Sequence, residues 1–519
     1  MTSRCAAITA ALLLFVASLP ALAQDVTLTS RDGQTEITGT LLGFDGEFYR
    51  LETLYGELTI DGSGVRCDGP GCPNLQDFIA EIAVSGSATM GAVLMPALLE
   101  GFAQRNGYEA IRQDRDETHF TYTLTDTRTG KRAADFYFRV TTSDEGFADL
   151  LADEADLVMS LREIRAGEQA RAKEAGMGDM TDPNRSRVLA LDAVVPIVSP
   201  QNPIQEMSPL NVAQVYAGQI TNWSVLGGPD APIALHAPSS ATGLGQATED
   251  QILGPLGLQI SDTATRHLRG QALAQAVVDD PFAFGVSSFA EVGNAQALVL
   301  KGACGRVLRA ARRSIKTEDY PLTAPMFLYT PARRLPKIAR EFLAFTRSTA
   351  AQNVIRRSGF VDQATEEVPI DQQGDRFSNA ISAAGPETSL AELQRMMDRL
   401  GPMKRLTMSF RFEAGSARLD AQSRSNLMQL ARGLEQGRFD ARSLYFIGFS
   451  DGVGPADRNR QIALTRAEAV RDAVLDLSET VDPEDADLQV DAFGEALPLA
   501  CDDSAWGRQA NRRVEVWLR

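Results

Sequence analysis

The first part of the chain alternates apolar and polar residues in short runs that turn signals separate. Residues 24–73 contain the runs VTLTS, TEITGTLLGF, EFYRLET and GELTI, with RDGQ and FDGE between them. Alternation with a period of two predicts strands with one buried face, and the Asp-Gly pairs predict hairpins. We therefore expect residues 24–73 to form a small β-barrel-like domain.

Beyond this region the apolar pattern changes to strands that alternate with helical segments. Over residues 74–363 the alternation predicts an α/β fold with two lobes rather than one sheet. Residues 364–404 then become polar and rich in turn formers, apart from one short helix expected over Leu390 to Leu400. Such composition is typical of a connecting segment, and we expect residues 364–404 to be a linker.

The last part of the chain, residues 405–519, again alternates strands and helices. The strand LTMSFRF precedes a helix that Asp420 would cap and that carries leucines along one face. The runs LYFIGF, LQVDAF and RRVEVWL predict further strands around a helix from about Asn459 to Leu477. This order predicts a compact α/β sandwich, so that the whole chain is multidomain and mainly α/β.

Composition and charge place the chain among folded proteins and narrow its partners. The 519 residues exceed the size of one ordinary domain, and 44% of them are hydrophobic and 23% charged. A net charge of -17 argues against nucleic acid as a partner, although a local loop can still attract a small anion.

The N-terminal segment has the pattern of a secretory signal peptide. Residues 1–23 combine a basic residue, an apolar core from Ala6 to Ser18, and small residues at Ala21 and Ala23. We expect an exported mature chain that begins at Gln24 and has no transmembrane segment, because no apolar run reaches about 18 residues.

Four cysteines follow the predicted cleavage point. Cys67 and Cys72 bracket a Gly/Pro loop and are placed to form a disulfide in an oxidising compartment. Half of a zinc site is the alternative, but no second pair or nearby His accompanies them. Cys304 and Cys501 lie in different predicted domains, and either an interdomain bond or two thiols fits their positions.

An acid and a base stand close together in the C-terminal region. Asp451 ends an apolar strand and opens the glycine-containing loop SDGVGPADR, and Arg466 lies on the helix that follows. A carboxylate and a guanidinium on facing walls are complementary to a zwitterion, because one binds an ammonium group and the other a carboxylate.

Three motifs in this region resemble the OmpA-like peptidoglycan-binding domain. They are GFSDGVGPADRNRQIALTRAEAV, FGEALP and NRRVEV, in that order over residues 405–519. The resemblance implies that Asp451 and Arg466, with Asn459 at the family's Asn position, bind the diaminopimelate of the peptidoglycan peptide stem. Phe449 stands where His is usual, and the other departures also leave the charged pair intact. The alternative is a surface Asp and a helix Arg that bind no ligand.

Several stretches of the middle region resemble periplasmic substrate-binding proteins of the phosphate-binding type. The clearest is VPIVSPQNPIQEMSPLNVAQVYAGQITNWSVLGG at Val195 to Gly228. Further matches are SGSATMG at Ser85 to Gly91, ADLVMSLREI at Ala155 to Ile164, and YPLTAPMFLYT at Tyr320 to Thr330. The resemblance implies a two-lobed type II periplasmic-binding-protein fold over residues 74–363.

In that family backbone N–H groups at helix starts, Ser and Thr hydroxyls and usually an Arg hold a tetrahedral oxyanion. The resemblance places the corresponding ligand-binding residues at Ser87, Thr89, Ser143, Ser160, Arg162, His236, Ser240 and Thr242.

Two departures from the family pattern weaken the phosphate prediction. Asp144 and Glu145 follow Ser143 and would repel phosphate unless they point outward, and His236 replaces the family's Arg. Arg162 is a candidate substitute cation, and a hydrogen-bonded structural His is the alternative for His236. An oxyanion, another small ligand or protein partner, and no ligand at all remain open.

Neither catalysis nor a membrane pore fits the pattern. The three histidines, His119, His236 and His267, are widely separated and lie near no nucleophile motif, and no metal-ligand spacing or cofactor motif is present. No series of amphipathic membrane strands precedes the C-terminal domain, as a pore would require. We therefore expect a binding protein that is not an enzyme.

The two resemblances together predict a protein held non-covalently on peptidoglycan that carries a domain for a small solute, in particular a phosphate-like anion. Its role would be sensing, capture or storage in the periplasm of a Gram-negative bacterium, on the wall and near the inner face of the outer membrane. The alternative is a structural envelope adaptor whose two-lobed domain binds a protein partner or no ligand.

Overall fold

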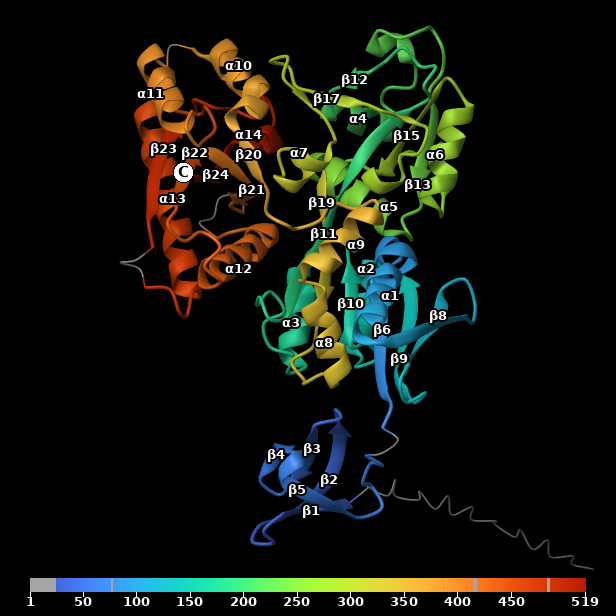
Figure 1. Ribbon diagram of the computed structural model, residues 1–519. Coiled ribbons are helices and arrows are strands. Elements are labelled where there is room, and N and C mark those ends of the chain that lie inside the picture. Colours follow the sequence, from blue (N-terminus) through green and yellow to red (C-terminus); the bar gives the residue numbers. More distant parts are fainter. Residues whose placement is uncertain (1–24, 76–77, 386, 414–417, 483–485) are drawn as a thin grey trace, which may run out of the picture. The chain divides into compact units, whose positions relative to one another are not determined.

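The computed structural model describes residues 25–75, 78–385, 387–413, 418–482 and 486–519 (Figure 1). The predicted signal peptide, residues 1–23, and Gln24 lie outside the described residues. The chain divides into two compact units, one made of the residues up to Ala80 with Leu335–Ile338 and the other of the rest.

The N-terminal unit contains one antiparallel sheet with the strand order β4-β3-β2-β1-β5. Its elements are β1 (Asp25–Ser30), β2 (Glu36–Phe44), β3 (Phe48–Thr53), β4 (Gly56–Asp61), the 3-10 turn η1 (Gly62–Gly64) and β5 (Val65–Asp68). The predicted disulfide between Cys67 and Cys72 is present.

The predicted barrel is not confirmed. Among the described residues no pairing joins the edge strands β4 and β5, and the sheet there is open. Period-two alternation predicts strands and hairpins, but closure depends on strand tilt and stagger, which the alternation does not determine.

The first lobe of the larger unit has helices packed on a sheet. It contains β6 (Ala80–Ser87), the π-helical turn η2 (Met90–Leu94), α1 (Met95–Asn106), β7 (Tyr108–Asp114), β8 (His119–Asp126), β9 (Arg132–Thr141), α2 (Ser143–Leu151), β10 (Leu157–Ser160), α3 (Ala166–Glu174), α8 (Lys337–Phe345) and α9 (Thr349–Arg357).

The second lobe follows the same α/β pattern. It contains β12 (Glu206–Met207), α4 (Pro209–Tyr216), η3 (Trp223–Leu226), β13 (Ala234–Pro238), α5 (Gly243–Thr248), η4 (Glu249–Leu253), η5 (Gly254–Leu256), β14 (Thr265–His267), α6 (Gly270–Asp279), β15 (Ala283–Ser288), η6 (Phe289–Glu291), β16 (Gln296–Ala297), β17 (Val299–Lys301), β18 (Val307–Leu308) and α7 (Arg312–Lys316).

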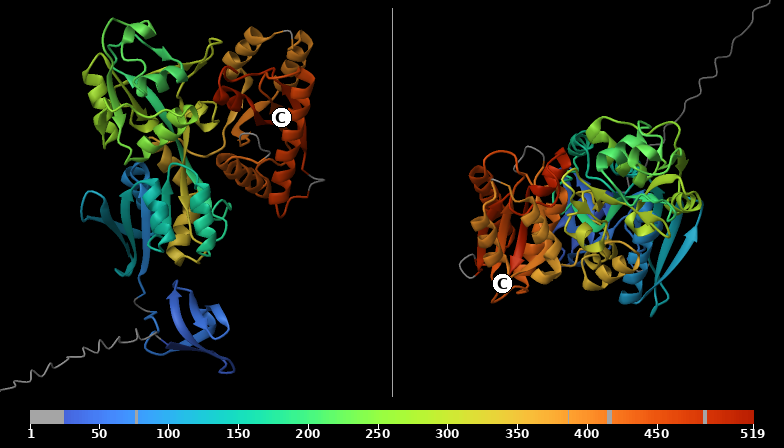
Figure 2. Two further views of the ribbon diagram at one scale, coloured as in Figure 1. Left: turned by 180° about the vertical axis from the view of Figure 1, so that it is seen from behind. Right: turned by 90° about the horizontal axis from the view of Figure 1, so that it is seen from above.

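One long strand runs through both lobes. Strand β11 (Ser186–Val198) pairs with β19 (Thr323–Tyr329) along its first part and with β15 along its second (Figures 1 and 2). The resulting strand order is β14-β13-β15-β11-β19-β10-β6-β9-β8-β7. Residues 188–198 of β11 are all buried, as expected for a strand covered on both faces.

The C-terminal sheet has the order β20-β21-β24-β22-β23. Its elements are β20 (Glu367–Pro369), the 3-10 turn η7 (Ile370–Gln373), α10 (Gly374–Ala383), α11 (Leu390–Leu400), β21 (Lys404–Arg411), α12 (Ala421–Glu435), β22 (Leu444–Phe449), α13 (Ala456–Leu477), β23 (Leu488–Gly494), α14 (Ala505–Asn511) and β24 (Arg513–Leu518). Helices α12 and α13 cover one face, and α10 and α11 cover part of the other (Figures 1 and 2).

Residues 364–404, expected to be a linker, belong to this packed structure. Strand β20 pairs with β21. The predicted helix over Leu390–Leu400 is confirmed as α11, and it buries Leu393, Met396 and Leu400 in the core on that face of the sheet. These three residues have the helical spacing of an amphipathic face, and this spacing outweighs the polar composition of the segment.

Strand alternation gives β21 two chemically different faces. Leu406, Met408 and Phe410 pack toward α12 and α13. Arg405 and Arg411 alternate with them, and they pair with Asp319 and Glu318 of the middle region at 2.7 and 3.2 Å. Period-two alternation thus places the apolar core on one side of the strand and the contact with the two-lobed region on the other.

A disulfide between Cys304 and Cys501 links the second lobe to the C-terminal domain, with Cα atoms 5.6 Å apart. Next to it the N–H of Ala303 donates to Asp503 at 2.8 Å, and Arg306 donates to the carbonyl of Ala500 at 3.0 Å. The bond closes a chain segment of 197 residues, so it restricts the unfolded chain strongly.

Replacement of both Cys304 and Cys501 by Ser should lower the free energy of unfolding by about 2–5 kcal/mol, because the unfolded chain regains loop entropy. Urea denaturation followed by the fluorescence of Trp223, Trp506 and Trp517, all in the larger unit, measures this change. The double Ser variant of the N-terminal disulfide, which closes a segment of only five residues, is the control and should leave this transition unchanged. Equal midpoints for wild type and the first variant would contradict a linking role.

Candidate functional sites

The C-terminal candidate site lies where β22 ends and α13 begins. All six residues of β22 are buried. A Cβ on Gly448 would lie 2.0 Å from the carbonyl oxygen of Ala463 on α13, so only Gly allows the strand and helix to approach this closely. This close packing brings Asp451, in the loop after β22, near Arg466 on α13.

Asp451 already has a cationic partner, and it is not Arg466. Its Oδ2 accepts a hydrogen bond from Nη1 of Arg512 at 2.7 Å, and Oδ1 accepts one from the N–H of Val453 at 3.3 Å. Arg512 was not among the residues predicted for this site, although it is the first Arg of the NRRVEV motif. Its position within that motif could have indicated that Arg512 belongs to the site.

Arg466 lacks a salt-bridge partner among the described residues. Its guanidinium lies 5.3 Å from the ring centre of Phe412, and no carboxylate of the described chain forms a salt bridge with it. Burial and the neighbouring Arg512 lower the pKa of Arg466, whereas Asp451 acts to raise it. One acid and two guanidinium groups therefore share this site, and the group without a salt-bridge partner can bind an incoming carboxylate.

Asn459 holds the loop. It is buried, and its Nδ2 donates to Glu495 at 2.9 Å and to the carbonyl of Gly454 at 3.4 Å. The N–H of Gly452 donates to Asp502 at 2.8 Å, which fixes the other side of the loop. These bonds determine where Asp451 points.

In the two-lobed region, three of the predicted residues lie around one junction between the lobes. Ser87 ends β6 and is fully buried, and its hydroxyl has no hydrogen-bond partner among the described residues. A Cβ on Gly243, the first residue of α5, would lie 3.0 Å from Ser87 Oγ and 2.7 Å from Leu161. Ser143 Oγ accepts the N–H of Leu161 at 3.1 Å. Thr242, the third predicted residue here, precedes Gly243. Strand ends and helix starts of both lobes therefore converge on Ser87.

Arg162, the candidate cation, is neutralised by acidic residues. Its Nη2 donates to Glu168 at 2.7 Å, and its Nε donates to Asp144 at 3.1 Å. Asp144 therefore turns toward arginines rather than toward the lobe junction. Ser160 uses its hydroxyl within the same loop, where it donates to the carbonyl of Arg162 at 2.7 Å.

His236 is paired with a second histidine. Its Nδ1 lies 2.9 Å from Nε2 of His267 on the neighbouring strand β14. Burial and the nearby His267 lower the pKa of His236, and burial lowers the pKa of His267. Because both rings favour the neutral form, His236 supplies no fixed positive charge where the family has an Arg.

The remaining predicted residues have distinct roles. Thr242 caps α5, because its Oγ1 accepts the N–H of Gly245 at 3.1 Å and donates to the carbonyl of Ser239 at 2.7 Å. Ser240 is exposed, and Thr89 precedes η2 without capping it. Ser287, which was not predicted as a site residue, is fully buried near the end of β15, and its hydroxyl has no partner in the described structure. The two serines at the end of the run AFGVSS could have indicated that Ser287 lies at a strand end that carries hydroxyl groups.

The described residues provide neither a membrane-spanning helix nor a metal site. None of their helices combines the length and the apolar character that crossing a membrane requires. They also contain no group of three or more His, Cys, Asp or Glu side chains arranged to hold a metal ion.

A two-lobed α/β domain with strand ends at the lobe junction, followed by an α/β sandwich with a charged loop, defines a two-domain binding protein. Residues 79–349, more than half of the chain, match the model of the PBP superfamily domain, and residues 411–512 match that of the OmpA family. The chain belongs to the PBP superfamily and carries a C-terminal OmpA family domain. Both are families of binding proteins, and the chain is accordingly not an enzyme.

Individual relatives also match either the two-lobed region or the C-terminal domain. The chain is 22% identical to the phosphate-binding protein PstS of Borreliella burgdorferi over 34% of its own length and 65% of that protein. It is 29% identical to the probable lipoprotein YiaD of Escherichia coli over 21% of its length and 46% of that protein. An ABC-type phosphate transport receptor from Vibrio cholerae matches 54% of the chain and 99% of its own, with 21% identity and a TM-score of 0.42. The chain thus spans less than two thirds of both PstS and YiaD.

Proposed function

We propose that this protein binds a small phosphate-like oxyanion at the lobe junction of its PBP domain while its OmpA domain holds it on peptidoglycan. Binding of a solute is supported by the buried hydroxyl of Ser87, which ends β6 and lies next to Gly243 at the start of α5. A buried hydroxyl without a partner costs about 1–3 kcal/mol, which a bound acceptor would recover. An oxyanion is such an acceptor, and the relative PstS is named as a phosphate-binding protein.

The donors at the junction are neutral. Ser143 accepts from Leu161 and still has its own hydroxyl hydrogen to donate. Arg162 is compensated by Asp144 and Glu168, and His236 is paired with His267. Because the described residues place no free cation at this junction, the site favours an anion of low charge that hydroxyl and backbone N–H groups can surround.

The wall claim rests on the charges around Asp451. Arg466, which has no carboxylate partner in the described chain, would bind the carboxylate of diaminopimelate. Asp451 would bind the ammonium group through the oxygen that Arg512 does not use. Such a protein would act in the periplasm, near the inner face of the outer membrane, for sensing, capture or storage.

A second candidate function is a structural envelope adaptor. Leu161 is a buried apolar residue, and its side chain packs against Gly243, the first residue of α5. An apolar side chain at this position favours a closed lobe junction. In that case the two-lobed domain would serve protein contacts and the wall site would remain the main activity.

Titration of inorganic phosphate into the mature chain tests the solute site. We expect heat of binding for wild type and a Kd roughly tenfold higher for Ser87→Ala, because one hydrogen bond to a charged group is lost. Ser382→Ala, which removes an exposed hydroxyl from α10, is the matched control and should bind like wild type. No heat with wild type, or equal affinity in all three proteins, would favour the adaptor.

Sedimentation with purified peptidoglycan tests the wall site. Asp451→Ala and Arg466→Ala should each reduce the retained fraction, with an apparent affinity at least roughly tenfold lower, because each leaves one charge of the zwitterion unpaired. Arg458→Ala removes an exposed Arg from the same helix and should be retained like wild type. If both site variants sediment as fully as the control, the proposed wall contact is wrong.

A further inference from the structure

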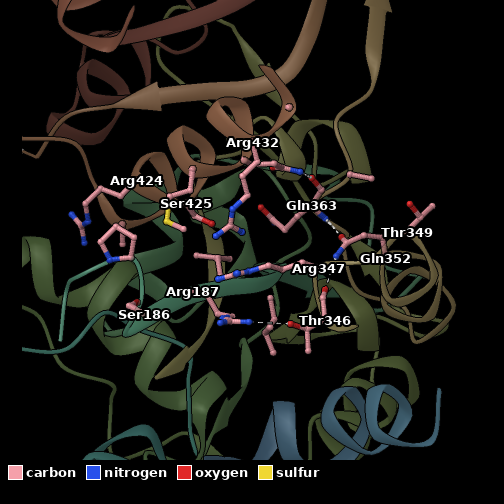
Figure 3. A pocket seen from close by; sticks show the side chains of 18 of the residues that line it. Ser186, Arg187, Thr346, Arg347, Thr349, Gln352, Gln363, Arg424, Ser425 and Arg432 are labelled. Carbon is pink, nitrogen blue, oxygen red and sulfur yellow. Dashed lines mark hydrogen bonds between the residues drawn. The ribbon is translucent and has the colours of Figure 1, made fainter. Parts of the chain in front are cut away.

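A cavity lies between the first lobe and helix α12 of the OmpA domain, both in the larger unit. It has a volume of about 390 Å³, within the range of about 300–1,000 Å³ typical of small-molecule sites. Arg187 at the start of β11, Arg347 between α8 and α9, and Arg432 on α12 line it. Figure 3 shows their guanidinium groups gathered within the cavity.

The charge of this cavity opposes that of the chain. Its lining contains five arginines and no Asp or Glu, although the chain as a whole carries a net charge of -17. Two of the five have other partners: Arg424 pairs with Glu163, and Arg438 donates to the carbonyl of Thr365 at 2.8 Å. The remaining three form no salt bridge with any carboxylate that the structure describes.

The three unpaired arginines are held close together. Nη1 of Arg187 donates to the carbonyl of Leu343 at 2.6 Å and to Thr346 Oγ1 at 3.4 Å, which fixes its direction. Burial and repulsion by Arg347 and Arg432 lower the pKa of Arg187 to about 9. Burial and Arg432 lower the pKa of Arg347 to about 10. Arg187 and Arg347 therefore stay charged at neutral pH, and an anion would relieve the repulsion among the three guanidinium groups.

A neutral donor in the same cavity also lacks a partner within the described part of the chain. Gln363 is held by its backbone, because its N–H donates to Gln352 at 2.7 Å and its carbonyl accepts from Gln429. Its Oε1 accepts from Gln422 at 2.9 Å, which leaves Nε2 buried and unpaired among the described residues. Hydrogen-bond donors of two kinds therefore line a cavity that has no negative group in its walls.

We propose that this cavity binds a small multivalent anion, with phosphoryl or carboxylate groups, between the PBP domain and the OmpA domain. Arg187 and Arg347 would contact it from the two-lobed side and Arg432 from α12. Guanidinium groups suit such anions because their planar fork matches two oxygens at once. An anion that contacts both domains stabilises their contact. This site shares no residue with the junction at Ser87, so it does not depend on the proposed solute site.

Calorimetric titration of pyrophosphate and, separately, citrate into the mature chain tests this proposal, at fixed ionic strength set with sodium chloride. We expect at least one of the two to bind. Arg347→Gln and Arg432→Gln should each raise its Kd roughly tenfold or more. The exposed Arg357, on α9 next to the cavity, provides the control, since Arg357→Gln removes the same charge and should bind like wild type.

Two control measurements distinguish this cavity from the lobe junction and separate loss of binding from loss of folding. Ser87→Ala should leave the affinity for pyrophosphate or citrate unchanged. If Ser87→Ala loses this affinity while the arginine variants bind normally, the anion binds at the lobe junction and the proposal is wrong. Without anion, Arg347→Gln and Arg432→Gln should melt at or above the temperature of wild type, because they remove repulsion. No binding of either anion by wild type, or a large fall in melting temperature of both variants, would overturn the proposal.

Discussion

The C-terminal domain is built around one buried carboxylate, that of Glu515 in the middle of β24. Glu515 is fully buried and contacts Arg513 at 2.6 Å, Arg405 at 3.3 Å and Arg376. Burial acts to raise its pKa, but the three arginines outweigh this effect and hold the pKa below its usual range. Arg405 extends the network to Asp319 of the two-lobed region at 2.7 Å. Because removal of one partner from such a network leaves a buried unpaired charge, the two domains are coupled through it.

The same network helps to position the candidate sites. Arg513 is held by Glu515, and the preceding residue, Arg512, donates to Asp451 in the loop of the wall site. Strand β21, which contributes Arg405, packs with α12, which contributes Arg432 to the arginine-lined cavity. The disulfide between Cys304 and Cys501 adds a covalent link to the charged one. Under the proposed wall contact, a PBP domain attached this firmly to the OmpA domain would have little freedom to diffuse, which would favour sensing or storage over delivery.

Local pattern predicted much of this structure, and long-range pairing accounts for what it missed. Period-two and helical spacing located the N-terminal strands and helix α11, and a loop of four residues was enough to predict the Cys67–Cys72 disulfide. Three features depend on residues that meet only in the folded chain. They are the open form of the N-terminal sheet, the partner of Cys304 and the neutralisation of Arg162. The arginine-lined cavity joins positions 187, 347 and 432, and no local pattern connects residues so far apart in sequence.

We propose that one molecule of this protein holds a solute while it is itself held on the wall. The most direct test of this proposal is cosedimentation of radiolabelled phosphate with purified peptidoglycan in the presence and absence of the mature protein. Label should sediment only when the protein is present, in proportion to the protein retained, and unlabelled phosphate should displace it. Protein that sediments fully without any displaceable label would contradict a solute-binding role and leave the chain as an envelope adaptor.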